Sequence, residues 1–451
     1  MRKIIKSLQL SHILIFILLQ LVLSVNAQST RNLKEELEKI PGVMVFTMKS
    51  DPMFSESYEL FFTQPVDHNN PDGEKFTQRV LLGHVGFDRP TVAVIEGYSI
   101  YTDKAGEITK FLNANQITIE HRFFADSRPD SIPWNYLTIK QAAADHHEII
   151  SELKKIYEKK WVSTGISKGG QATIYHRRFY PSDVDVSVPY VAPLNFSDED
   201  ERYYSFLKTV GTPECRKKIY NYQLILFQNK AKLMPMIKQM AKTRNYSFSM
   251  GIDRAFDLSV LEYSFSFWQW CGSCALIPDR TAILDDIYQH YIYVNPISFF
   301  EDSDIKHNLP FYYQALTEIG MYGYEIGPFK KYLKDTTNIT FEFNLPEGVE
   351  EVTYNYEAMH DINQWIQTEG NYMLYIYGKN DAYFATAVEP SKNTNAVRMV
   401  NPKGCHTTRI ETFPDNMKKE IYKILQDWMS EKPQTLNQVS GGSSDVMFEV
   451  F

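Results

Sequence analysis

The sequence predicts an α/β protein in which a mainly parallel sheet, covered by helices, is interrupted by one long helical insertion. Short apolar runs alternate with amphipathic helical segments in two stretches of the chain, 28–196 and 357–432. This alternation predicts a parallel sheet, because strands that are buried on both faces are apolar along their whole length. Between these stretches, residues 197–356 hold mostly helical segments rich in Lys, Tyr, Phe and Met. About 160 residues are too many for a simple loop, so we expect a helical cap there.

The first part of the chain predicts an antiparallel pair, followed by buried strands. The runs 58–62 and 77–82 are joined by the turn-rich segment 67–73, which favours antiparallel pairing. Buried strands are then predicted at 91–95, 116–119, 160–164, 184–191, 372–377 and 396–400. Apolar positions at helical spacing predict helices over 137–157, 169–180 and 413–429.

The N-terminal segment 1–27 has the pattern of a signal peptide. Basic residues precede the strongly apolar stretch 13–25, and Ala27 is a small residue at the expected cleavage site. An uncleaved membrane anchor is the alternative, but the short apolar core and the polar residues after it favour cleavage. We therefore expect an exported protein, periplasmic or secreted, that has no stable membrane anchor. The last residues, 433–451, are predicted as a loose tail.

Composition and charge limit the possible partners. The chain has 451 residues, of which 43% are hydrophobic and 23% are charged, so it is long enough for a large core. Its formal net charge is −8 and it contains no long basic run, which argues against nucleic acid as a partner.

The four cysteines are Cys215, Cys271, Cys274 and Cys405, and they allow one or two disulfides in an oxidising compartment. Cys271 and Cys274 have the Cys-x-x-Cys spacing, but a matching second pair that would complete a zinc site is lacking. We favour a disulfide from Cys215 to one member of that pair, and expect Cys405 to be simply buried.

The segment Gly165-Ile166-Ser167-Lys168-Gly169 is the most informative motif, because it has the spacing of a nucleophile elbow. It joins the predicted strand 160–164 to the predicted helix 169–180, and such a turn exposes the serine hydroxyl at a helix N-terminus. Only glycine tolerates the close backbone approach around the turn. The pentapeptide alone is equally compatible with an ordinary Gly/Ser turn, so the rest of the chain must decide.

An activated serine needs a histidine base and an acid that orients the base. Asp381 follows the predicted strand 372–377, and His406 follows the predicted strand 396–400. The chain order Ser, Asp, His, with acid and base in loops after late strands, is that of the α/β-hydrolase fold. The alternative for Asp381 is an ordinary turn aspartate, and the alternative for His406 is an ordinary surface or core histidine. The joint agreement of order and position favours the triad Ser167, Asp381 and His406.

The oxyanion of the tetrahedral intermediate requires two N–H donors. The first is expected to be the backbone N–H of Lys168, the residue after the nucleophile. The second should lie in the loop after the strand 91–95, at Gly97 or Tyr98. The side chain of Lys168 itself is expected to be solvated.

Several motifs, in the order expected, resemble the exported serine peptidases related to prolyl carboxypeptidase and dipeptidyl peptidase II. The bacterial tripeptidyl aminopeptidase branch is the most similar. The motifs are 64–68 with 76–79, the Glu-His-Arg-aromatic-aromatic run 120–124 with 127–129, the elbow 164–170, and 191–193. The resemblance covers most of the mature chain. It implies an α/β-hydrolase with a helical cap that releases short peptides from free N-termini, often with a proline-related preference, and it assigns the triad to the same three residues.

An enzyme of this kind must also recognise a terminal ammonium. Glu96 and Glu120 are candidates, because both stand at strand ends near the expected site, although pairing of Glu120 with an arginine is an equal alternative. Phe267 and Trp268 belong to an aromatic run in the cap that could line the peptide site or simply pack within the cap.

No metal or other cofactor is predicted. His146 and His147 lack the partner of a His-Glu-x-x-His motif and are interpreted as surface residues.

Two other functions remain possible at this level. An exported esterase or lipase would have the same fold and triad, since neither fixes the acyl substrate. A non-catalytic, hydrolase-like binding protein is less favoured, because the order of the triad residues is intact.

Overall fold

The computed structural model describes residues 31–336, 339 and 341–430. The predicted signal peptide and the predicted tail lie outside the described residues. Within those residues, every helix is too short or too polar to cross a bilayer.

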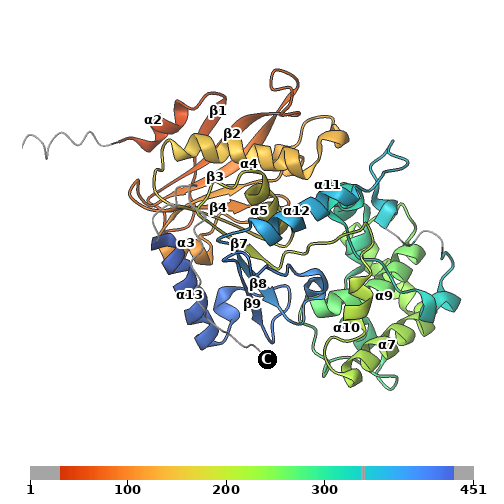
Figure 1. Ribbon diagram of the computed structural model, residues 1–451. Helices are drawn as coiled ribbons and strands as arrows, with labels where there is room; N and C mark the ends of the chain where they lie inside the picture. Colours follow the sequence, from red (N-terminus) through yellow and green to blue (C-terminus); the bar gives the residue numbers. More distant parts are fainter. Residues whose placement is uncertain (1–30, 337–338, 340, 431–451) are drawn as a thin grey trace, which may run out of the picture.

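A nine-stranded sheet forms the centre of the described chain, in the order β1-β2-β3-β5-β4-β6-β7-β8-β9 (Figure 1). The strands β1, β2, β3 and β5 pair antiparallel, and the rest of the sheet, from β5 to β9, is parallel. The strands are β1 Val43–Thr47, β2 Glu56–Pro65, β3 Lys75–His84, β4 Thr91–Ile95, β5 Asn115–Ile119, β6 Trp161–Ile166, β7 Val186–Tyr190, β8 Leu374–Gly378 and β9 Val397–Asn401. The predicted fold is confirmed: this is an α/β-hydrolase sheet extended by the edge strand β1.

Helices cover both faces of the sheet. On one face, α3 (Glu107–Leu112) and α13 (Asp415–Ser430) meet through the stacked rings of Phe111 and Tyr422, 4.2 Å apart. On the other, α4 (Ile139–Lys154), α5 (Lys168–Phe179) and α12 (Tyr356–Thr368) pack together, and the Tyr175 hydroxyl donates to Met359 Sδ at 3.4 Å. The short helix α2 (Leu33–Glu38) packs near β1.

Residues 197–356, which we call the cap, separate β7 from β8 in the sequence. The α-helices of its described part are α6 Arg202–Leu207, α7 Pro213–Gln228, α8 Lys230–Arg244, α9 Ile252–Gln269, α10 Leu284–Val294 and α11 Asp302–Gln314. Four short 3₁₀ helices of the described chain lie outside the cap, at Ala125–Ser127, Trp134–Tyr136, Ala382–Thr386 and Ile410–Thr412. In its described part the cap has 3₁₀ helices at Ile297–Phe300, Gly327–Tyr332 and Phe341–Asn344 and a π-helical segment at Ala315–Ile319. Figure 1 shows α7, α9 and α10 grouped to one side of the sheet.

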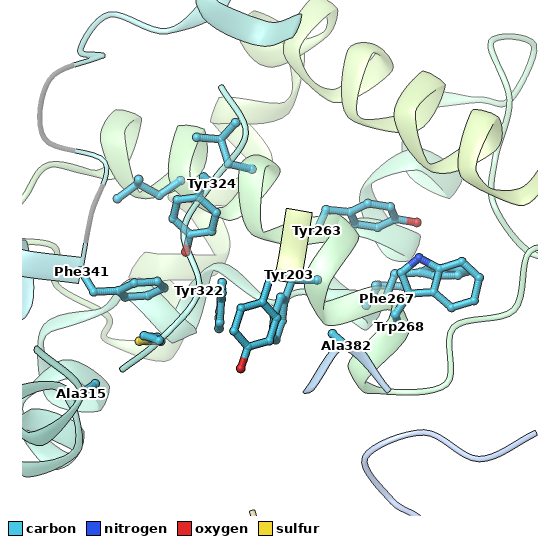
Figure 2. Packing of buried hydrophobic residues seen from close by; sticks show 14 of the residues in the cluster. Tyr203, Tyr263, Phe267, Trp268, Ala315, Tyr322, Tyr324, Phe341 and Ala382 are labelled. Atoms are coloured by element: carbon cyan, nitrogen blue, oxygen red, sulfur yellow. The ribbon is translucent and has the colours of Figure 1, made fainter. Parts of the chain in front are cut away.

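The cap has an aromatic core that continues to the end of β8. The rings of Phe265 and Tyr322 stack at 3.5 Å, and Tyr203 contacts both. Figure 2 shows this cluster reaching Ala382, the residue after Asp381. The aromatic core of the cap therefore packs against the loop that carries Asp381, a candidate catalytic residue.

Candidate active site

Ser167 lies at the sharp turn between β6 and α5, and its backbone is held in an unusual conformation. Its φ is 57° and its ψ is −121°, a region that residues with a side chain rarely adopt. The Ser167 N–H donates to the Tyr190 carbonyl at 2.9 Å, which ties the turn to the end of β7. The serine therefore stands at the N-terminus of α5, at the carboxyl edge of the parallel strands.

The glycines of the motif are required by close packing. A Cβ at Gly169 would lie 2.5 Å from the Ile95 carbonyl oxygen, and one at Gly170 would lie 2.8 Å from the Tyr190 carbonyl oxygen. A Cβ at Gly165 would also lie 2.5 Å from the Ile95 oxygen. Because backbone atoms cannot yield as a flexible side chain can, only glycine fits at these positions.

The structure brings Asp381 and His406 into direct contact. His406 Nδ1–H donates to Asp381 Oδ2 at 2.7 Å, and Asp381 Oδ1 accepts from the Tyr383 N–H at 3.1 Å. Asp381 is fully buried and His406 is 6% exposed. Because the carboxylate holds the proton on Nδ1, Nε2 of the neutral imidazole is the nitrogen that can accept a proton.

Backbone contacts fix the loops that carry these two residues. The Asn380 N–H donates to the Gly404 carbonyl at 2.9 Å, and the His406 N–H donates to the Gln269 carbonyl of the cap at 3.0 Å. Cys405, expected to be simply buried, is buried but also forms a disulfide with Cys271 at the end of α9. The histidine loop is thus held from the Asp381 loop on one side and from the cap on the other.

The second disulfide joins Cys215 to Cys274, as the sequence predicts. It lies entirely within the cap. Cys271 and Cys274 therefore bond to different partners, and Cys271 links the cap to the loop that carries His406.

The loop after β4 packs directly against the nucleophile turn. A Cβ at Gly97 would lie 2.5 Å from the carbonyl carbon of Lys168 and from the Gly169 nitrogen. Tyr98 follows: burial raises the pKa of its hydroxyl, and a hydrogen bond with the Ser167 side chain acts in the opposite direction. The structure therefore places Gly97, Tyr98 and Lys168 around Ser167.

Comparison with known proteins places this geometry in a family. Residues 27–445 match the model of the family described as PS-10 peptidase S37. The chain belongs to this family of serine peptidases. The family assignment agrees with the resemblance inferred from the sequence motifs, and it favours a peptidase over an esterase or a non-catalytic binding protein.

Two curated relatives of this S37 peptidase are informative. The prolyl tri/tetrapeptidyl aminopeptidase of Streptomyces mobaraensis is 31% identical over 417 residues, which cover 90% of this chain and 87% of the relative. The lysosomal Pro-X carboxypeptidase of Mus musculus is 30% identical over 193 residues, 37% of this chain and 38% of the relative. Among solved structures, the proline iminopeptidase of Mycobacterium smegmatis covers 82% of this S37 peptidase and 98% of its own chain, at a TM-score of 0.39 and 12% identity.

Glu120 is fully buried, which does not suit the predicted role in substrate binding. One of its oxygens accepts from the Ile100 N–H at 3.0 Å, the other accepts from the Ser127 N–H and hydroxyl at 3.0 and 2.9 Å, and Arg79 lies 3.9 Å away. The alternative, pairing with an arginine, describes this carboxylate better. Glu120 thus holds together the loops that carry Ile100 and Ser127.

Glu96 is the other predicted candidate, and its carboxylate is partly exposed. Among the residues that the structure describes, it has no hydrogen-bond donor and no cationic partner. Burial, together with the negative charge of Glu120, raises its pKa to about 7. The carboxylate immediately precedes Gly97 and Tyr98, so an uncompensated acidic group stands beside the loop that faces Ser167.

The aromatic run of the cap reaches His406 through its last residue, Trp270, and not through Phe267 or Trp268. Phe267 is fully buried and Trp268 is 7% exposed, and both pack within the cap, so neither faces His406. Trp270 is 55% exposed and meets the His406 ring edge to face at 5.8 Å. Phe267 and Trp268 lie within α9 and pack against other residues of the cap. Trp270 follows the last residue of the helix and is therefore free to face His406.

Asp304 and His307 of α11 also face the loop after β4, and no sequence motif pointed to either residue. His307 Nε2 lies 3.2 Å from the Tyr101 hydroxyl and 3.4 Å from Ser99 Oγ. Burial and the charges of Glu96 and Asp304 raise the pKa of Tyr101. Burial raises the pKa of Asp304 itself to about 6. The cap therefore adds an acidic group near Tyr101, in the loop after β4.

Two predictions about charged side chains near the site are wrong. Lys168 is only 3% exposed and is not solvated, and His146, interpreted as a surface residue, is 1% exposed. Both side chains point from helices α5 and α4 into the packed interior. In the part of the chain that the structure describes, no group of three or more His, Cys, Asp or Glu side chains could hold a metal ion.

The two disulfides provide a matched test of how the cap supports His406. Replacing Cys271 and Cys405 together by serine should lower the free energy of unfolding by about 2–4 kcal/mol and also lower kcat, because the His406 loop loses its covalent link to the cap. Replacing Cys215 and Cys274 should lower stability by a similar amount and leave kcat near the wild-type value. Urea unfolding and peptidase assays on both double variants make the comparison. Equal kcat values in the two variants would contradict the proposed support.

Proposed function

We propose that this protein is an exported serine exopeptidase that releases tripeptides or dipeptides, with a proline-related preference, from free N-termini. The observation that carries the proposal is Glu96, a carboxylate without a cationic partner in the described structure, next to the loop that packs on the nucleophile turn. The aminopeptidase named above, similar over most of its length, supports the same reaction.

The proposed chemistry uses Ser167, His406 and Asp381. His406 Nε2 accepts the hydroxyl proton as Ser167 Oγ attacks the scissile carbonyl, and Asp381 stabilises the imidazolium that forms. The negative oxygen of the tetrahedral intermediate accepts hydrogen bonds from the Lys168 N–H and from an N–H of the Gly97–Tyr98 loop. His406 then gives its proton to the leaving amine, the acyl-enzyme forms, and a water molecule activated by His406 releases the peptide.

Glu96 would bind the terminal ammonium of the substrate, with Asp304 adding negative charge from the cap. A carboxylate in a partly buried site has lost much of its hydration, and an ammonium ion restores a favourable interaction that the described protein does not supply. An acetylated N-terminus has neither the charge nor the donors. This arrangement would therefore select a free terminus.

Trp270 and Tyr383 would form apolar walls near the scissile bond. The Tyr383 ring lies 5.0 Å from the His406 ring, on the loop that carries Asp381, and Trp270 meets the same ring from the cap. Aromatic faces suit the flat, apolar ring of proline better than a charged or flexible side chain. This is the physical basis that we offer for a proline-related preference.

Export is part of the proposal. The predicted signal peptide 1–27 lies outside the described residues, but all four cysteines form disulfides. Disulfides persist in oxidising compartments and are rare in the cytosol, so the two bridges favour a periplasmic or secreted protein.

The first test uses a defined peptide pool, half with free and half with acetylated N-termini. The wild-type protein should release di- or tripeptides from the free termini only, and Ser167→Ala should abolish release, because the nucleophile is lost. Mass spectrometry of the products measures both. Cleavage of neither half, together with hydrolysis of simple esters, would favour an esterase, and unchanged activity of Ser167→Ala would refute the catalytic assignment.

The second test follows the charge of Glu96. With Ala-Ala-Pro-p-nitroanilide, Glu96→Gln should lower kcat/KM about 10- to 100-fold, as expected for a lost charge-assisted hydrogen bond. In the wild type, the ratio of kcat/KM for this peptide to that for p-nitrophenyl acetate should fall as the pH drops through about 7, since protonation of Glu96 removes the charge that binds ammonium.

The ester has no ammonium group, so dividing by its kcat/KM removes the pH dependence of the chemical step that both substrates share. In Glu96→Gln the ratio should be low and should no longer change at about pH 7. The exposed Glu420→Gln on α13 serves as the control and should behave as the wild type. A fall of the ratio at about pH 7 that persists in Glu96→Gln would show that another group binds the ammonium.

A further inference from the structure

Lys168 presents an unusual combination of charge and burial. Its side chain starts at the first residue of α5 and is 3% exposed. No carboxylate lies within ion-pair distance of its ammonium among the described residues, and burial lowers its pKa well below the ordinary value. The Nζ atom lies over the rings of Phe124 and Tyr98, 5.2 and 5.6 Å from their centroids. Burying a lysine without a counter-charge costs free energy of folding unless its polar group is hydrogen-bonded.

The hydrogen bond of Lys168 goes to the loop that faces the nucleophile. Nζ donates to the Gly97 carbonyl oxygen at 2.7 Å. In a trans peptide, the C=O of one residue and the N–H of the next point in opposite directions. When Lys168 holds the Gly97 carbonyl toward the protein interior, the Tyr98 N–H must point the other way, and in the described structure it has no hydrogen-bond partner.

The packing around Gly97 explains why this orientation matters. Gly97 lies directly against the Lys168–Gly169 backbone, where the first oxyanion donor is located, and a Cβ there would lie 2.5 Å from backbone atoms. Glycine permits this approach, but it also leaves the backbone free to rotate. A flipped peptide would direct the Gly97 oxygen, an acceptor, toward the site where negative charge develops.

We propose that the Lys168 side chain is a positioning residue that locks the Gly97–Tyr98 peptide so that the Tyr98 N–H is the second oxyanion donor. One residue then serves the oxyanion twice: its backbone N–H donates directly, and its side chain orients the other donor. The inference rests on the proposed role of Ser167 as nucleophile. It assigns to a buried lysine the orientation of a peptide that the glycine at position 97 does not fix by itself.

The test replaces Lys168 by Met, which fills the same space without a donor. With Ala-Ala-Pro-p-nitroanilide, kcat should fall about 100-fold, as for a lost oxyanion donor, while KM changes less than about 3-fold. The inhibition constant of the peptide boronate Ala-Ala-boroPro, which forms a tetrahedral adduct, should rise by a similar factor to the fall in kcat. Lys168→Gln, polar but too short to reach the Gly97 oxygen, should give the same result and covers the case in which the Met variant does not fold.

Tyr157→Phe is the matched control for a lost buried hydrogen bond. The Tyr157 hydroxyl contacts His84 Nδ1 at 2.9 Å. His84 is the last residue of β3 and lies beside the first residue of β5. This contact is therefore at the N-terminal ends of the parallel strands, whereas Ser167 is at their carboxyl ends. This variant should lose stability but keep kcat and boronate affinity. A folded Lys168→Met or Lys168→Gln with wild-type kcat and boronate affinity would overturn the inference while Ser167→Ala remains inactive. An active Ser167→Ala would instead refute the proposed function on which it rests.

Discussion

The tight backbone packing at the nucleophile turn is the constraint on which the rest of the structure depends. Ser167 is held at a positive φ because its N–H bonds to the end of β7, and the flanking glycines lie against the carbonyl of Ile95. This contact fixes the distance between β4, β6 and α5, and with it the place of the loop that begins at Glu96. Glycine at Gly165 and Gly169 makes the approach possible, and the parallel sheet makes it rigid.

The cap completes the site and also supports it. The Cys271–Cys405 disulfide and the bond from the His406 N–H to Gln269 attach the histidine loop to α9. The same cap supplies Trp270 beside His406 and Asp304 near Tyr101 of the loop after β4. Chemistry and specificity are therefore coupled, because a shift of the cap would move His406 as well as the residues proposed to bind the peptide.

Local patterns in the sequence predicted what local physics decides, namely the parallel strands, the elbow, and the loops that bring Asp381 to His406. Contacts between distant segments were beyond reach: Cys271 and Cys405 are 134 residues apart, and no local pattern selects that pairing. The burial of Lys168 was missed because lysine is normally solvated, and only the packed loop around Gly97 shows why a buried donor is useful. The edge strand β1 and the six-residue helices α2 and α3 are too short for periodicity to reveal.

Covalent labelling tests the central claim, a nucleophilic Ser167 that selects free N-termini, most directly. The full-length mature protein would be treated with the diphenyl phosphonate of Ala-Ala-Pro, with a free or an acetylated N-terminus, and analysed by intact mass and peptide mapping. The account predicts one adduct per chain, on Ser167, formed much faster by the free-amine reagent. Labelling at another residue, or equal rates for the two reagents, would contradict it.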